Sequence, residues 1–139
     1  MSKPHLTHVA GRSADIAKSI DFYRRYAGLH VVHDRMDGGM RVVWLSEEEE
    51  DPTFVLVLIG VGHEARADAS LAEHLGFDVA SRDAVDDIAA RGKAEGVLVQ
   101  GPVYAGPIVG YFCMLRDPDG TIVEFSHGQS INPKLVERG

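Results

Sequence analysis

The sequence has one cysteine, no long apolar run and no excess of basic residues, and each absence excludes a class of protein. Cys113 alone cannot form an intrachain disulfide or a cluster of thiolate metal ligands. The longest apolar run, FVLVLIGVG at 54–62, is far too short to cross a bilayer. The formal net charge of −7 argues against binding to nucleic acid, which needs a basic surface, and suits a divalent metal or a cationic ligand.

The N-terminal residues MSKPHLTHVAG lack the apolar region of a signal peptide. We therefore expect a cytoplasmic protein with a reduced thiol and without a membrane partner. A chain of 139 residues, 45% of them hydrophobic, is long enough to bury a substantial core.

Apolar periodicity and turn residues predict the same order of elements in each half of the chain. In the first half a strand, a helix and three strands are expected at 5–11, 13–28, 29–34, 40–46 and 53–59. In the second half the same order is expected at 72–79, 83–95, 97–103, 110–115 and 121–126. Ser13 is a candidate cap for the first helix, and Ser81 or Asp83 for the second.

This repeat indicates an internal duplication and an α+β fold built of two βαβββ modules. We place the first module at 1–62, a linker at 63–71, the second module at 72–128 and a C-terminal tail at 129–139.

The stretch RDPDGTIVEFSHG at 116–128 carries a glutamate, Glu124, inside an apolar strand, where a charge is costly unless something compensates it. One interpretation is an edge strand with a solvated face, and the other is a metal ligand. Superposing the halves places His8 and His74 at equivalent positions and gives Glu124 the apolar counterpart Val57. Two histidines and one carboxylate can hold Fe(II), Mn(II), Ni(II) or Zn(II) and leave positions open for substrate.

Three segments carry a resemblance to a known family: LTHVAGRSADIAKSIDFYRRYAGLHVV, EHLGFDV and DPDGTIVEF. They resemble the opening, the second ligand strand and the closing hairpin of proteins of the vicinal oxygen chelate superfamily, which includes glyoxalase I, the bleomycin resistance proteins and the extradiol dioxygenases. The resemblance implies curved sheets that form a cupped, barrel-like cavity. It also implies that His8, His74 and Glu124 are the metal ligands.

Glyoxalase I has a second glutamate ligand where this chain has Val57, so the resemblance argues against glyoxalase I chemistry. It implies instead a dioxygenase-like or lyase-like enzyme whose small oxygenated substrate chelates the metal through adjacent oxygens. The alternative is a metal-free protein that sequesters a drug, as bleomycin resistance proteins do. Tyr111 is a candidate for proton transfer or substrate binding beside Glu124, or else an aromatic packed on the sheet. We expect a homodimer, in which His8 of one copy can meet His74 and Glu124 of the other.

Overall fold

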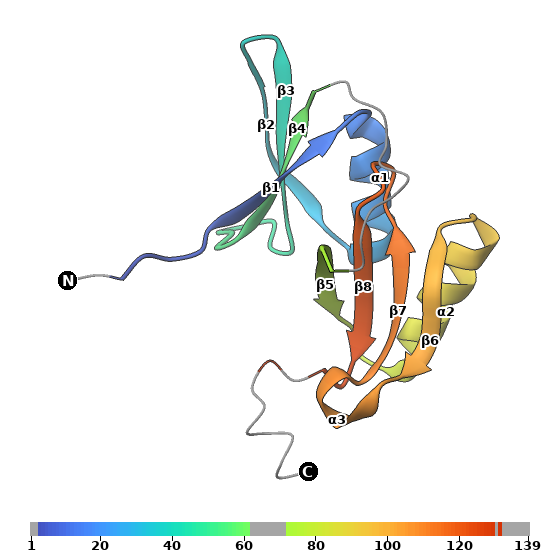
Figure 1. The fold of residues 1–139 in the computed structure, drawn as a ribbon. Helices are drawn as coiled ribbons and strands as arrows, with labels where there is room; N and C mark the ends of the chain where they lie inside the picture. Colours follow the sequence, from blue (N-terminus) through green and yellow to red (C-terminus); the bar gives the residue numbers. More distant parts are fainter. Residues whose placement is uncertain (1–2, 62–71, 130, 132–139) are drawn as a thin grey trace. The chain divides into compact units, whose positions relative to one another are not determined.

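The chain folds into two units of the same topology in a computed structural model that describes residues 3–61, 72–129 and 131 (Figure 1). Contacts between residues divide the chain into two units, Met1–Ala65 and Arg66–Gly139. The proposed linker at 63–71 lies outside the described residues, as does all of the proposed tail except residues 129 and 131.

The first unit is a four-stranded mixed sheet with one helix. Its elements are β1 (His8–Ser13), α1 (Ile16–Ala27), β2 (His30–Asp37), β3 (Met40–Ser46) and β4 (Val55–Gly60). The strand order is β1-β4-β3-β2, in which β1 runs parallel to β4 and the other pairs are antiparallel. The helix contributes the buried aromatic side chains Phe22, Tyr23 and Tyr26 to the core.

The second unit repeats this arrangement and adds a short helix. Its elements are β5 (His74–Asp78), α2 (Arg82–Ala94), β6 (Leu98–Tyr104), α3 (Gly106–Val109), β7 (Tyr111–Arg116) and β8 (Ile122–His127). The strand order β5-β8-β7-β6 again has one parallel pair, β5 with β8, followed by antiparallel pairs. The structure thus confirms an α+β fold of two βαβββ modules.

Helix α2 packs on one face of the second sheet and leaves the other face to the candidate site. The Cys113 thiol lies 3.8 Å from the carbonyl oxygen of Val85 on α2. Leu115, two residues further along β7, lies against Gly92 on α2. Because side chains alternate along a strand, Phe112 and Met114 point to the opposite face.

The helix caps differ from expectation in the first unit only. The side chain of Asp15, not that of Ser13, accepts a hydrogen bond from the amide of Lys18 and caps α1. Ser13 is instead the last residue of β1, and its buried hydroxyl is 2.8 Å from that of Ser19. In α2 the cap is Ser81, one of the two predicted candidates. Within the described residues, no helix has the length and apolar character needed to cross a membrane.

Candidate functional site

The pairing of β5 with β8 brings His74 and Glu124 together on one face of the second sheet. His74 pairs with Ile122, and Gly76 pairs with Glu124, so all four residues share a face. The His74 Nε2 atom is 3.1 Å from Glu124 Oε2. Two of the three predicted metal ligands are therefore neighbours in the folded unit.

The Glu124 carboxylate is buried but only half satisfied. The residue is 4% exposed, and its Oε1 atom has no hydrogen-bond partner among the residues that the structure describes. A Cβ atom added to Gly76, the strand partner of Glu124, would meet nothing within 4 Å. A buried carboxylate normally requires a positive charge or hydrogen-bond donors on both oxygens. An imidazole nitrogen, a partnerless carboxylate oxygen and open space at Gly76 fit a divalent cation.

The rest of this sheet face is apolar. Met114 pairs with Glu124, and Phe112 pairs with Ser126. Phe112, Met114 and Ile122 form one buried cluster, against which Val109 of α3 packs. Such side chains exclude water from the neighbourhood of the carboxylate and strengthen electrostatic interactions there.

His8 lies in the first unit, at the position in β1 that His74 has in β5. It pairs with Val55, and Ala10 pairs with Val57, which is the register that His74 and Gly76 have with β8. Val57 is thus the structural counterpart of Glu124, and it is buried. The His8 ring is exposed, with Nδ1 3.0 Å from the Thr7 hydroxyl.

Tyr111 lies on the other face of its sheet from Glu124. It belongs to the set of β7 residues, with Cys113 and Leu115, that faces α2. Its hydroxyl donates a hydrogen bond to Asp86 of α2, and this bond raises the pKa of the tyrosine above its ordinary value. The structure therefore does not bring Tyr111 together with Glu124.

Gly76 and the apolar cluster are features of the site that sequence reasoning did not single out. Gly76 stands two residues after His74, which is the spacing of one face of a strand. A glycine on the same strand face as His74 has no side chain, so this spacing could have predicted the open space beside His74 and Glu124. Within residues 3–61, 72–129 and 131, no group of three or more His, Cys, Asp or Glu side chains is placed to hold a metal.

Comparison with known proteins identifies the family. The family model of the Glyoxalase/Bleomycin resistance protein/Dioxygenase superfamily matches residues 5–125. An uncharacterized protein of Pseudomonas aeruginosa is 40% identical over 130 residues, which are 94% of this chain and 93% of that protein.

Solved structures show the same fold at low sequence identity. Glyoxalase I of Leishmania major is 21% identical, with a TM-score of 0.73 over 98% of this chain and 95% of that one. The fosfomycin resistance protein FosX of Listeria monocytogenes, complexed with Mn(II) and sulfate, is 15% identical, with a TM-score of 0.72 over 96% and 99%. TnmS3, an antibiotic binding protein of a Streptomyces species, is 23% identical, with a TM-score of 0.63 over 91% and 98%. The chain belongs to the Glyoxalase/Bleomycin resistance protein/Dioxygenase superfamily.

Proposed function

We propose that this protein is a metal-dependent enzyme that acts on a small organic substrate through two adjacent oxygens. His74, Glu124 and His8 are the proposed ligands of a divalent metal, with Fe(II), Mn(II), Ni(II) and Zn(II) as the candidates that suit this donor set. The reaction class is dioxygenase-like or lyase-like chemistry.

The observation that carries the proposal is the buried Glu124 carboxylate. Its Oε2 atom is 3.1 Å from His74 Nε2, and its Oε1 atom has no partner among the described residues. Burying a negatively charged carboxylate is costly unless a positive charge compensates it, and a bound cation would provide that charge. Membership of a family whose fold includes the Mn(II) complex of FosX supports the same interpretation.

The residues around the pair have distinct roles in this proposal. A bound divalent metal supplies a Lewis acid that stabilises negative charge developing on substrate oxygens. Glu124 and His74 would hold that cation at the sheet face, and Gly76 leaves space next to them. Phe112, Met114 and Ile122 exclude water and accommodate an apolar part of the substrate.

Glyoxalase I chemistry is not part of the proposal, although a glyoxalase I shares the fold. The counterpart of Glu124 in the first sheet is Val57, which is buried and pairs with Ala10 and Trp44. A valine can neither bind a metal nor move a proton, so the site has one carboxylate where glyoxalase I has two.

Metal-free sequestration of a drug is the rival function, and the antibiotic binding protein TnmS3 has the same fold. The net charge of −7 and the apolar cluster beside Glu124 would suit a cationic, partly apolar ligand. In that case Glu124 would bind the ligand's positive charge directly.

Metal content per chain distinguishes the two functions. Untagged protein, stripped and then incubated with each of the four metals separately, should retain close to one equivalent of at least one of them. Glu124→Gln, His74→Ala and His8→Ala should each lose it, while the matched exposed variants Glu50→Gln and His5→Ala should keep it. Full retention by Glu124→Gln would refute the ligand assignment. No retention by the wild type would favour the sequestration function.

A further inference from the structure

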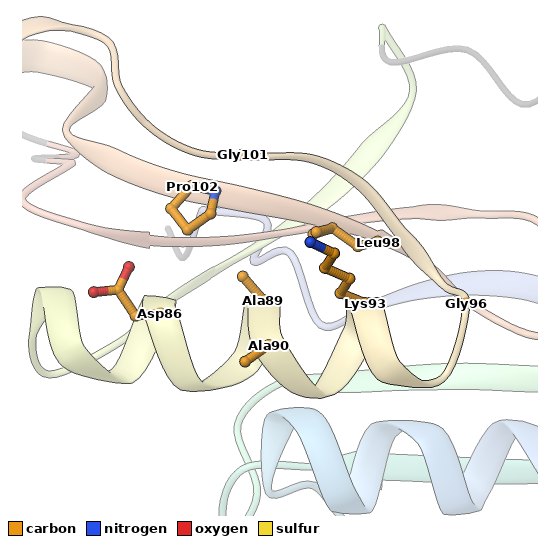
Figure 2. Close-up of a pocket in the computed structure, with 8 residues that line it drawn as sticks. All are labelled: Asp86, Ala89, Ala90, Lys93, Gly96, Leu98, Gly101 and Pro102. Atoms are coloured by element: carbon orange, nitrogen blue, oxygen red, sulfur yellow. The ribbon is translucent and has the colours of Figure 1, made fainter.

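A groove in the second unit lies between α2 and β6 (Figure 2). It is on the sheet face that α2 covers, whereas Glu124 shares the opposite face with Phe112 and Met114. Its volume is about 560 Å³, and it is lined by Asp86, Ala89, Ala90, Lys93, Gly96, Leu98, Gly101 and Pro102. Sites for small molecules are typically roughly 300–1,000 Å³. The groove therefore has the size of a ligand site and is separate from the candidate metal centre.

The duplication shows why this groove is hollow. Counted from the cap residues Asp15 and Ser81, Tyr23 of α1 has the same helical position as Ala89 of α2. Tyr23 is 1% exposed and fills the core of the first unit, where it packs edge-on against Phe22 at 5.1 Å between ring centroids. Ala89, which is 3% exposed, has only a methyl group at that position and forms part of the groove lining.

Strand β6 contributes to the opening because it departs from regular pairing with β7. Its register shifts between Leu98 and Gln100 and again between Gln100 and Val103. Gly101 has a φ of +88°, and a Cβ atom there would lie 2.6 Å from the carbonyl oxygen of Phe112. Only glycine fits this position, so the wall at Gly101 and Pro102 is a built feature of the strand.

Opposite charges stand at the two ends of the groove. Figure 2 shows Asp86 and Lys93 at opposite ends of the lined stretch of α2, with Ala89 between them. Seven residues on a helix span about 10 Å along its axis. Asp86 accepts a hydrogen bond from Tyr111 through Oδ1, which fixes the carboxylate at its end. Ala89 and Pro102 make the stretch between the charges apolar, and Leu98 lies beside Lys93 (Figure 2).

We infer that this groove binds a small zwitterionic molecule whose amine and carboxylate are separated by an apolar chain. The amine pairs with Asp86 and the carboxylate with Lys93, while the chain lies over Ala89. Exposed charge pairs contribute about 0.2–1 kcal/mol each, so affinity requires both ends together with apolar contact. Binding does not depend on the metal, because the groove is on the sheet face that α2 covers and Glu124 is on the opposite face.

The test uses 6-aminohexanoate as the probe and backbone amide NMR shifts of α2 and β6 as the readout. We expect saturable shifts, with weaker binding of hexylamine and of hexanoate, each of which lacks one charged end. Asp86→Asn and Lys93→Met should each weaken 6-aminohexanoate binding about three- to fivefold. The matched exposed variants Asp87→Asn and Lys18→Met should bind like the wild type.

A variant that fills the groove tests whether the probe binds there. Ala89→Tyr restores the residue that the first unit has at this position, and it should abolish the shifts. Ala90→Phe serves the same purpose at an exposed position if Ala89→Tyr does not fold. The inference is overturned if the shifts do not saturate, if filling leaves them unchanged, or if Asp87→Asn weakens binding as much as Asp86→Asn. Glu124→Gln should bind the probe normally, which separates this result from that of the metal site.

Discussion

At the residue scale, one buried carboxylate in the candidate site affects the free energy of unfolding. Glu124 is 4% exposed and shares a sheet face with Phe112, Met114 and Ile122. The apolar surroundings make its charge costly, and His74 compensates only the Oε2 side. A cation at Oε1 would therefore stabilise the folded state as well as prepare it for chemistry.

Metal binding should consequently appear in thermal unfolding. Adding the metal that the wild type retains should raise its Tm, because a ligand that binds only the folded state stabilises it by about 2.7 kcal/mol at a hundredfold excess over Kd. Glu124→Gln should show no such rise, whereas Glu50→Gln should show the full rise. A scanning fluorimetry titration checks this, and an equal rise in Glu124→Gln would contradict the proposed ligand role.

The Cys113 thiol should make stability depend on pH in the alkaline range. Burial raises its pKa from an ordinary 9.0 to about 12, so the folded state holds a proton that the unfolded chain releases. This contribution to stability is complete below pH 9 and is lost as the pH rises from 9 towards 12. The expected slope approaches about 1.4 kcal/mol per pH unit.

Urea unfolding at pH 8, 9 and 10 measures this slope, and Cys113→Ala provides the control. Tyr111 also has a raised pKa and acts in the same direction, so the difference between wild type and Cys113→Ala isolates the thiol. Parallel pH profiles for the two proteins would contradict the prediction. The folded wild type should also resist thiol reagents that modify the unfolded chain rapidly.

The residue scale also shows what the sequence could not determine. His74 and Glu124 were predicted as ligands from the duplicated pattern, and the structure places their side chains together. For Tyr111 the sequence leaves two positions open, beside Glu124 or packed on the sheet as an aromatic, because its strand pairs with the Glu124 strand. Its face depends on register, and a slip of one residue moves every side chain to the other face. Sequence alone leaves that register open.

At the element scale, local signals predicted most of the secondary structure. Gly28 adopts the left-handed conformation that ends α1, and Gly120 closes the turn of DPDG with a 3.0 Å hydrogen bond to Asp117. Such signals can be recognised in the sequence because each depends on only a few adjacent residues. Helix α3 was missed because four residues, GPIV, carry no period. The assignment of Ser13 as a cap failed because its hydroxyl bonds Ser19 within the tertiary structure.

Two glycines in strands should differ sharply in their tolerance of a side chain. Gly101 in β6 has a positive φ and no space for a Cβ, since Phe112 O would lie at 2.6 Å and Cys113 Cα at 3.0 Å. Gly101→Ala should therefore destabilise the protein by about 2 kcal/mol or more.

Gly76→Ala is the matched comparison, because a Cβ there meets nothing within 4 Å and its φ is not positive. Its unfolding midpoint should stay close to that of the wild type. Urea denaturation of both variants measures the contrast. Equal destabilisation by Gly101→Ala and Gly76→Ala would contradict the prediction that position 101 has no space for a Cβ atom.

At the scale of the whole molecule, each unit is a four-stranded sheet whose outer strands, within the described residues, pair with a neighbouring strand on one side only. The edges are β1 and β2 in the first sheet and β5 and β6 in the second. Exposed edges are usually covered, and self-association is one way to cover them. We therefore expect a homodimer in solution, in which His8 of one copy completes the site formed by His74 and Glu124 of the other.

Mixing two inactive variants tests this arrangement. His8→Ala and Glu124→Gln should each bind no metal, but subunits exchanged by unfolding and refolding together should form mixed dimers. Sharing across copies gives each mixed dimer one site with all three ligands, so an equal mixture should regain about a quarter of the wild-type metal content. If ligands come from a single chain, every chain in the mixture lacks one and no metal returns. That outcome would reject the shared site while leaving the ligand assignment intact, because each single variant would still have lost the metal.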